Sequence, residues 1–327
     1  MILRFASLGL LLLVSTTARS SAQGDIQTLL DTFNVITGDY SLQSNETEGA
    51  TFVYGSYMPS NNVRFGFNSG TAANDSDNML WLNNGLSGSG TTTLLSGSLV
   101  TRIDVENTKF ALNGNAPGTP ILREGVTLWD AAVNSLGFSD AFEIQSTLQA
   151  ASSQWAALTT NSFTSTPGNG SLTFNASPTL IDGFQVAVFD IDGESAFGSA
   201  SNVYDRLELQ FNGAETVLIN VAGQNITIND NFTNGFVNNE SKILFNFFEA
   251  ETVTINRNIR AGIFAPNATV NQGGSNFDGT VVAAVLNQNA EIHNEKFEGP
   301  LPFQPIPEPS SALLLLGGAT LLLRRRR

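Results

Sequence analysis

Residue types that commonly catalyse reactions are scarce in this sequence. His293 is the single histidine, and there is no cysteine. A hydrolytic triad, an imidazole metal site or a histidine general base would therefore all depend on His293, and thiolate chemistry is excluded. No Gly-x-Ser-x-Gly motif leads from a clear strand into a helix, and no Gly-x-x-x-x-Gly-Lys-Ser/Thr phosphate loop occurs. We interpret His293 as a structural residue, hydrogen-bonded in a late strand, and predict no catalytic residues.

Carboxylates are densest at Asp190, Asp192 and Glu194, with Asp182 nearby. In a loop these side chains could hold a hard cation such as Ca²⁺, although the EF-hand pattern is incomplete because no glutamate follows at the required offset. The alternative is an Asp-Gly turn between two strands. Paired carboxylates could also serve a polysaccharide-active enzyme, which would require the four residues to converge in a cleft. Calcium at Asp190, Asp192 and Glu194 is the candidate metal site, and we expect no other cofactor.

The composition restricts the elements that can position these residues. Charged residues make up 13% and hydrophobic residues 41% of the 327 positions, and glycine occurs 30 times. These values exclude a coiled coil and a disordered acidic chain. The formal charge is −14, and six of the 15 basic residues lie in segments 1–22 and 310–327, which contain no acidic residue. The chain between them carries 9 basic and 29 acidic residues, which excludes nucleic acid as a partner.

Short apolar runs between turn residues predict a mainly β domain over residues 23–303. Residues 63–67 alternate at period two, whereas 68–98 are typical of loops. Residues 262–265 are echoed by 279–283, and 267–270 by 289–292. This period near 20 predicts a β-solenoid-like body, with a β-sandwich as the alternative. Strands are predicted after residue 171 at 185–189, 206–211, 216–221, 225–228, 243–247, 252–255, 262–265, 269–270, 280–285 and 291–293.

One long helix is predicted beside these strands. Apolar residues at positions 141, 144, 148, 151, 155 and 158 form a single helical stripe. Asp140 and Glu143 resemble a capping box at its start. A shorter helix is predicted over residues 124–136. Both helices are interpreted as packing elements rather than binding elements.

The first 22 residues have the features of a signal peptide for the Sec translocon. Arg4 is followed by an apolar run and then by small polar residues. Small residues at Ser20 and Ala22 predict cleavage between Ala22 and Gln23. The mature chain would then begin at Gln23 on the far side of the membrane.

The last segment, residues 304–327, has the features of a second targeting segment. It contains Pro307, Glu308 and Pro309, an apolar stretch, and a final run of Arg324, Arg325, Arg326 and Arg327. The 14 residues from Ser310 to Leu323 would span about 21 Å as a helix, which is shorter than the ~30 Å hydrocarbon core. We predict a short transmembrane helix that serves as a temporary tether, with the arginines as its cytoplasmic stop.

This tail closely resembles the PEP-CTERM sorting signal of Gram-negative bacteria. The resemblance implies processing near Pro307-Glu308-Pro309 by an exosortase in the inner membrane, and a link to extracellular polysaccharide. A GPI signal is the alternative, but such signals normally end in apolar residues.

The domain between the two targeting segments resembles the choice-of-anchor A family of bacterial surface proteins. The matching motifs include Phe33-Asn34-Val35-Ile36, Glu48-Gly49-Ala50, Ala265-Pro266-Asn267-Ala268, Asp278-Gly279 and His293. The resemblance implies a β-solenoid-like body with an accompanying helix, surface exposure, adhesion and no known catalytic site.

These observations predict an exported, exosortase-processed protein of the cell surface or extracellular matrix of a Gram-negative bacterium. We expect it to be structural or adhesive and non-enzymatic, to meet the membrane transiently, and to bind extracellular polysaccharide or another surface polymer. The alternatives are a polysaccharide-active enzyme, or a glycan- or ice-binding module, on the same scaffold. Regular threonine columns on one flat side would support the binding module.

Overall fold

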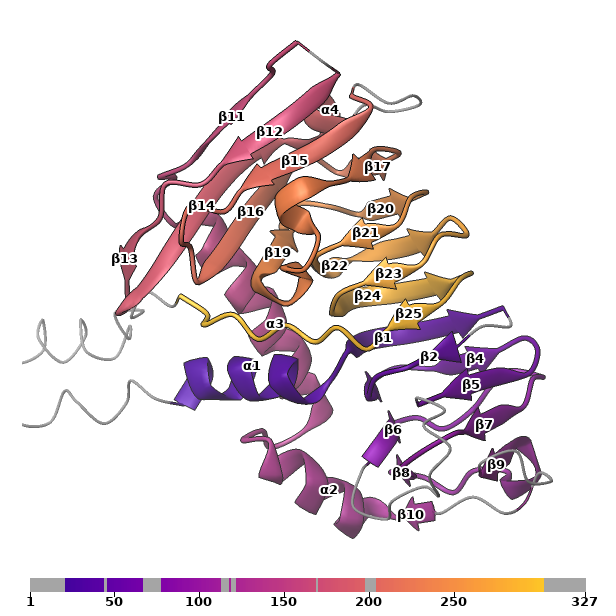
Figure 1. The fold of residues 1–327 in the computed structure, drawn as a ribbon. Helices are drawn as coiled ribbons and strands as arrows, with labels where there is room; N and C mark the ends of the chain where they lie inside the picture. The colour runs from indigo at the N-terminus through magenta and orange to yellow at the C-terminus, as the bar shows by residue number, and fades with distance from the viewer. Residues whose placement is uncertain are drawn as a thin grey trace, which may run out of the picture.

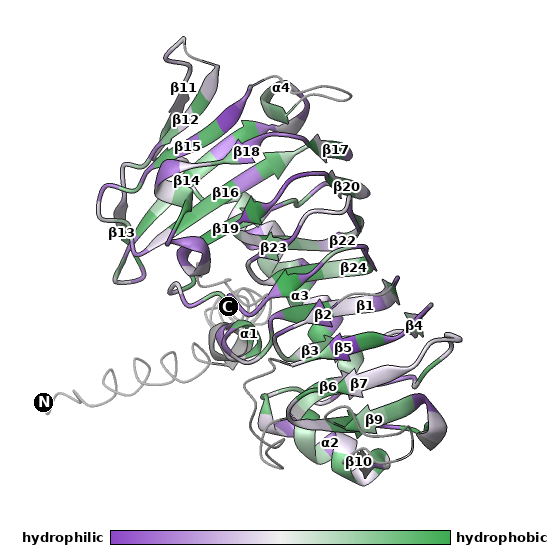
Figure 2. Cartoon of the chain, turned by 45° about the vertical axis from the view of Figure 1, so that its right-hand side comes forward, coloured by the Kyte–Doolittle hydropathy of each residue, from purple (hydrophilic) through white to green (hydrophobic). Residues whose placement is uncertain are grey.

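The computed structural model describes residues 21–43, 46–66, 78–112, 118, 122–168, 170–197 and 204–302. The described chain is a β-solenoid, in which mostly parallel strands of successive coils stack into long sheets (Figure 1). Apolar and polar residues alternate along many of these strands, so that one side of each strand faces the interior (Figure 2).

One side of the solenoid is a long sheet covered by helices, which we call the helix-covered face. Its strands are, in spatial order, β10 (Leu122–Glu124), β8 (Ser98–Thr101), β6 (Asn78–Leu82), β3 (Thr51–Val53), β1 (Val35–Leu42), β24 (Val281–Gln288), β22 (Gly262–Gln272), β19 (Ile243–Asn246), β16 (Thr216–Ala222), β14 (Phe184–Asp192) and β13 (Thr179–Ile181). The covering helices are α1 (Ser21–Thr32), α2 (Val126–Ser135) and α3 (Ala141–Ala156).

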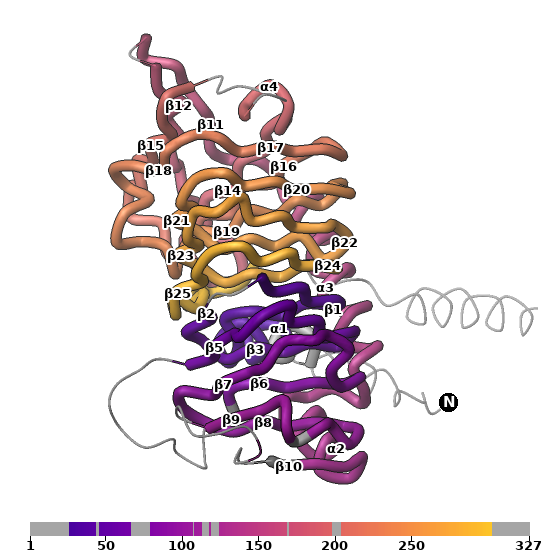
Figure 3. Tube along the Cα trace, turned by 90° about the vertical axis from the view of Figure 1, so that its right-hand side faces the viewer, coloured from indigo at the N-terminus to yellow at the C-terminus, as the bar shows by residue number. Residues whose placement is uncertain are grey.

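The same sheet continues past a bend into a second side. There the later residues of β22, β24 and β1 are joined by β17 (Asn225–Ile228), β20 (Thr252–Ile255) and β4 (Tyr57–Pro59). We call this side the ladder face. Figure 3 looks toward it, with β17, β20, β22, β24 and β1 stacked in that order.

Two smaller sheets complete the coils. The third face contains β21 (Ile259–Arg260), β23 (Phe277–Asp278), β25 (Ile292–His293), β2 (Glu46–Thr47), β5 (Val63–Phe65), β7 (Thr92–Leu94) and β9 (Phe110–Leu112). The other sheet contains β11 (Phe163–Ser165), β12 (Ser171–Asn175), β15 (Arg206–Gln210) and β18 (Asn231–Phe232). The short helix α4 (Gly193–Phe197) follows β14 directly.

The stacking order does not follow the chain order. Strand β1 pairs in parallel with β24 on one side and with β3 on the other, so the amino-terminal coils stack onto the last coil. The pairing of β1 with β24 extends from Val35↔Val281 to Leu42↔Gln288. We call this junction the seam. It joins segments about 245 positions apart in the chain into one continuous sheet.

Helix α3 packs against an apolar column that runs along the helix-covered face. Phe264, Val282, Ile36, Phe52 and Trp81 occupy matching positions in neighbouring strands, and all are at least 96% buried. Helices α1 and α3 cover this column with the residues Ile26, Leu29, Leu30, Ile144, Leu148, Ala151 and Trp155. The indole of Trp155 meets the Phe264 ring at a centroid distance of 4.7 Å. Removing this apolar surface from water drives the docking of the helices.

Most sequence predictions for the body are confirmed. The mainly β solenoid is present, α3 begins after the N-cap Asp140, and the Asp140 carboxylate accepts a hydrogen bond of 2.8 Å from the backbone N–H of Glu143. Helix α2 matches the shorter predicted helix. The loop predicted for 68–98 is wrong in part, because β6 and β7 lie inside it. Helix α1 was not predicted, and it contains the proposed cleavage point between Ala22 and Gln23.

Candidate functional site: the ladder face

The ladder face presents two columns of outward-facing side chains. Each strand buries every second residue: Ile226, Val253, Val270 and Leu286 point inward and are at least 98% buried. The residues between them are partly exposed and lie in register from coil to coil. The first column contains Asn225, Thr252, Thr269, Val285 and Asp39. The second contains Thr227, Thr254, Asn271, Asn287, Ser41 and Met58.

Strand geometry fixes the spacing of these groups. Neighbouring strands lie about 4.8 Å apart, and outward-facing residues repeat about every 6.6 Å along a strand. Hydroxyl and amide groups therefore occupy a two-dimensional grid over five coils, which Val285 and Asp39 interrupt in the first column and which Met58 ends in the second. Within the grid, the Asn287 amide donates a hydrogen bond of 2.8 Å to the Asn271 side-chain oxygen. Such a surface can bind a ligand whose own polar groups repeat, with little loss of backbone entropy because the strands are already fixed.

Two buried glutamines brace the corner between the ladder face and the third face. Gln272 donates to the carbonyls of Ser275 and Glu291 and accepts from the backbone N–H groups of Asn289 and Ala290. Both polar atoms of its amide are therefore satisfied inside the protein, which holds the corner rigidly.

Gln288 has the same position in the next coil, at the seam. Its amide donates to the carbonyls of Glu46 and Ala290, at 3.0 and 2.8 Å, and its oxygen accepts from the hydroxyls of Tyr40 and Thr47. Outside this corner, Ser41, Gln43, Asn271, Asn287 and Asn289 line a shallow depression of about 320 Å³.

The predicted calcium residues do not share a loop, and the alternative Asp-Gly turn between two strands is also wrong. Asp190 and Asp192 lie at the end of strand β14, and Glu194 lies in the first turn of helix α4. The Asp192 carboxylate accepts a hydrogen bond of 2.8 Å from the backbone N–H of Ser195. Hydrogen bonds from Ser195 lower the pKa of Asp192. Asp192 thus caps the start of α4, which explains the acidic residue there without a metal.

Asp190 is exposed and forms the outer end of a hydrogen-bond network that ties α3 to the sheet. Its carboxylate accepts hydrogen bonds from the Thr160 hydroxyl and, at 2.9 Å, from the Asn220 amide. Asn220 also donates to the carbonyl of Trp155, and Asn246 donates to Asn220 and to the carbonyl of Ser152, each at 2.9 Å. Calcium at Asp190, Asp192 and Glu194 stays a prediction, but both aspartates have structural roles.

The four carboxylates considered for an enzyme do not converge. Asp182 lies in the hairpin between β13 and β14, whereas Asp190 and Asp192 lie at the other end of β14. From Phe184, the first residue of β14, to Asp190 the strand advances by six residues, which corresponds to about 20 Å. These side chains therefore line no common cleft.

His293 lies in β25 at the seam, as predicted for a structural histidine. Its Nδ1 lies 2.5 Å from Asp278 Oδ1, and its Nε2 lies 3.2 Å from the Asn276 amide and 3.4 Å from Glu291 Oε2. Burial acts to lower the pKa of His293, but the hydrogen bond and charge of Asp278, with Glu48 and Glu291, outweigh it and raise the pKa. His293 therefore serves as a polar link in the third face.

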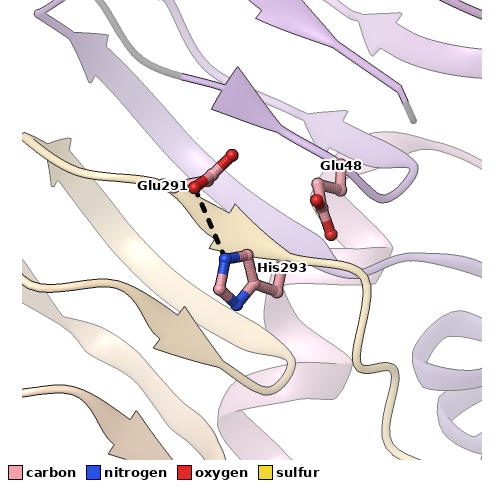
Figure 4. A group of neighbouring side chains, drawn as sticks. All are labelled: Glu48, Glu291 and His293. Atoms are coloured by element: carbon pink, nitrogen blue, oxygen red, sulfur yellow. Dashed lines mark ion pairs between the residues drawn. The ribbon is translucent and has the colours of Figure 1, made fainter. Parts of the chain in front are cut away.

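Glu48, Glu291 and His293 form the group in the described part of the chain whose ligand atoms all lie within 4.8 Å of one another (Figure 4). Glu48 comes from the amino-terminal coils, and the other two come from the last coil. The Glu48 carboxylate also accepts a hydrogen bond of 3.0 Å from the backbone N–H of Asn294. Both ring nitrogens of His293 have polar partners, and we interpret the group as a polar link across the seam.

A family model described as "Putative Ice-binding-like adhesive domain" matches residues 27–294, which include the ladder face, the seam and α3. The chain belongs to this family. Membership agrees with the expectation of a non-enzymatic adhesive domain at a surface. The description of the family does not specify choice-of-anchor A, which the motifs resemble, so that finer assignment stays a prediction.

Two solved structures are similar to this chain. One is an ice-binding protein from the Antarctic ascomycete Antarctomyces psychrotrophicus, with 10% identity, 83% of this chain and 97% of that chain covered, and a TM-score of 0.36. The other is a glycosylated ice-binding protein from an Arctic yeast, with 15% identity, 86% and 95% covered, and a TM-score of 0.35. No curated protein matches the chain.

The sorting residues lie outside the described part of the chain. This applies to Pro307, Glu308 and Pro309 and to the four final arginines, all beyond position 302. Among the helices that the structure does describe, none is long and apolar enough to cross a membrane. The signal peptide, the temporary tether and the exosortase site therefore stay predictions.

Sequence reasoning identified the strands of the ladder face but not the face itself. Asn225-Ile226-Thr227-Ile228 and Thr252-Val253-Thr254-Ile255 show the same alternation of polar and apolar residues. Aligning these two segments would have placed Thr227 beside Thr254, as the register does. The sequence signal is weaker at Asn271, Asn287 and Ser41 than at Thr227 and Thr254, because the type of polar residue changes from coil to coil.

Proposed function

We propose that this protein is an exported surface adhesin that binds an extracellular polysaccharide through the ladder face. The supporting observation is the in-register grid of hydroxyl and amide groups on the ladder face. A polysaccharide chain presents hydroxyl groups at regular intervals, and a fixed polar grid can contact many of them at once. Each contact is weak, but the contacts act together because one rigid sheet carries them all.

The position of the chain ends supports display of this face. Helix α1 and the segment leading to residue 302 lie together on the helix-covered side, away from β17 and β20 (Figure 1). Their contact includes a hydrogen bond of 3.1 Å from the backbone N–H of Leu301 to the Gln27 side chain. A tether that leaves from this side would turn the ladder face outward. We extend the proposal accordingly to export by a signal peptide, transient anchoring in the inner membrane by residues 304–327, and exosortase processing near Pro307-Glu308-Pro309.

Substitutions on the ladder face test the adhesive function. Thr254→Lys places a long charged side chain in the middle of the grid and should lower binding to insoluble extracellular polysaccharide at least about tenfold. Thr93→Lys is the matched control, because Thr93 is a partly exposed residue in β7 of the third face. Equal binding by Thr254→Lys and the unchanged protein, at equal stability, would refute the assignment of the ladder face.

Ice is the second candidate ligand, because a flat, regularly spaced polar face also matches a crystal lattice and the family is ice-binding-like. Partitioning of the protein into growing ice, compared with co-sedimentation with polysaccharide, separates the two candidates. The Thr254→Lys variant should lose whichever activity the ladder face carries.

Mass spectrometry of the released protein tests the sorting proposal independently of binding. We expect no peptides from residues 310–327 on material released from cells. Released protein that retains these residues would contradict exosortase processing.

A further inference from the structure

The outer side of the third face brings ionisable side chains together across the seam. Thr47 of β2 pairs with Ile292 of β25, and both side chains are fully buried. Because side chains alternate along a strand, the flanking residues Glu48, Glu291 and His293 lie on the outer side, where each is partly buried. The register therefore places two carboxylates and one imidazole, from the amino-terminal coils and the last coil, beside one another.

The separation between Glu291 and His293 matches that of two ligands on one zinc ion. Zinc binds imidazole nitrogen and carboxylate oxygen at about 2.0–2.2 Å, so ligand atoms in a tetrahedral site lie about 3.4 Å apart. His293 Nε2 lies 3.4 Å from Glu291 Oε2. Glu48 faces both from the neighbouring coil, and ligand atoms of the three residues all lie within 4.8 Å of one another (Figure 4). An approach closer by about 1.4 Å, which a flexible glutamate side chain allows, would complete a three-ligand site.

Asp278 holds the His293 ring in the form that a metal requires. Asp278 of β23 is the register partner of His293, and its Oδ1 lies 2.5 Å from His293 Nδ1. A carboxylate accepts hydrogen bonds, so Nδ1 of the neutral ring carries the hydrogen and the lone pair is on Nε2. A carboxylate on the far nitrogen is the usual partner of a metal-binding histidine, because it fixes the ring and makes it a better ligand.

Electron-rich atoms consequently face one another at the other edge of the ring. The Nε2 lone pair lies beside the Glu291 carboxylate, with Glu48 close by. Such groups repel one another unless a proton or a cation lies between them. The Asn276 amide, 3.2 Å from Nε2, is a neutral donor that would turn aside for an ion. A depression of about 360 Å³, which Glu46, Asn276 and Glu291 help to line, gives room for water as a further ligand.

We propose that Glu48, Glu291 and His293 bind a zinc ion that joins the amino-terminal coils to the last coil across the seam. One imidazole and two carboxylates, with water in the fourth position, fit the pattern of open zinc sites. The imidazole favours zinc over Ca²⁺ and Mg²⁺, which prefer oxygen ligands. The site is separate from the sequence-predicted calcium candidate on β14 and α4, and it does not depend on what the ladder face binds.

Thermal unfolding of the full chain tests this site, with protein that carries no histidine tag and has been treated with EDTA and then freed of it. Saturating ZnCl₂ should raise the melting temperature by about 3 °C or more, and CaCl₂ at the same concentration should give a much smaller shift. His293 is the single histidine and there is no cysteine, so His293→Gln should abolish the zinc shift. Glu194→Gln removes an exposed carboxylate of the other cluster and should retain the shift.

Calorimetric titration with ZnCl₂ gives a second readout that does not depend on how stable each variant is. We expect one zinc ion per chain in the unchanged protein, none in His293→Gln, and at least about tenfold weaker binding in Glu48→Gln. Three results would overturn the proposal. They are a melting temperature that ZnCl₂ leaves unchanged, zinc binding of unchanged affinity in His293→Gln or Glu48→Gln, and a calcium shift equal to the zinc shift. The first would leave the group as a polar link only, and the last would assign the ion to carboxylates alone.

Discussion

Replacement of Gln288 by methionine tests whether the seam holds the two parts of the solenoid together. Methionine is similar in length but cannot form the four hydrogen bonds of the Gln288 amide. Three of those bonds reach Tyr40, Glu46 and Thr47 in the amino-terminal coils, across the seam. The Tyr40 and Thr47 hydroxyls would still pair with each other at 2.9 Å. The carbonyls of Glu46 and Ala290 would lose these side-chain partners.

The expected loss follows from those two carbonyls. A buried acceptor left without a partner costs about 1–3 kcal/mol, so Gln288→Met should lower the free energy of unfolding by about 4 kcal/mol. Domains are typically stable by only about 5–15 kcal/mol, so the loss should be plain in urea unfolding. Since the core is continuous across the seam, a single cooperative transition is expected for both proteins.

Gln272→Met is the matched control. Its four bonds all end at residues 275–291, so it removes as many bonds without touching the seam. Hydrogen exchange should become faster in β1 and β2 in Gln288→Met but not selectively in Gln272→Met. A stability change below about 1 kcal/mol in Gln288→Met, or identical exchange patterns in the two variants, would refute the bracing role of Gln288.

Three further predictions concern charged groups. The pKa of His293 is raised in the folded protein, so its contribution to stability is full below its unfolded pKa and is lost as the pH rises through the folded pKa. The variant His293→Gln should flatten this part of the curve of stability against pH, measured by urea unfolding. Burial raises the pKa of Asp230 to about 6 in the folded protein, so the stability should fall as the pH rises from about 4 to about 6, and Asp230→Asn should abolish that fall. Asp140→Ala removes the cap of α3 and should cost about 1 kcal/mol in thermal unfolding, whereas Asp140→Asn, which keeps a capping oxygen, should cost much less.

Sequence reasoning was most successful where a structural element depends on residues that are close together in the chain. The α3 stripe and its cap are local patterns, and both were predicted correctly. The echo between 262–265 and 279–283 matches the observed register, since Ile263 pairs with Val281 and Ala265 with Ala283. The second echo, between 267–270 and 289–292, does not match, because Thr269 pairs with Val285. Coil length varies, so similar short strings need not occupy equivalent places.

The long-range features could not be read from local patterns. No property of residues 35–42 indicates that they pair with 281–288, because both segments look like ordinary buried strands. The pairing partners of Asp190 are also distant, and its hydrogen bond to Asn220 shows why a dense carboxylate cluster need not bind a metal. Motif residues such as Asn34 and His293 gather at the seam, where the Asn34 amide donates to the His293 carbonyl at 2.8 Å.

Insertion of the amino-terminal coils beside the last coil has a consequence for adhesion. In a solenoid that stacked in chain order, the two ends would lie at opposite tips, and a tether would pull on a terminal coil. Here α1 and the segment to residue 302 meet at the middle of the stack. Leu301 and Phe297 are buried there, and the Trp155 indole donates a hydrogen bond of 2.9 Å to the carbonyl of Pro302. Force on a carboxy-terminal tether would therefore reach α3 and the central sheet first, while the ladder face stays intact and free to bind.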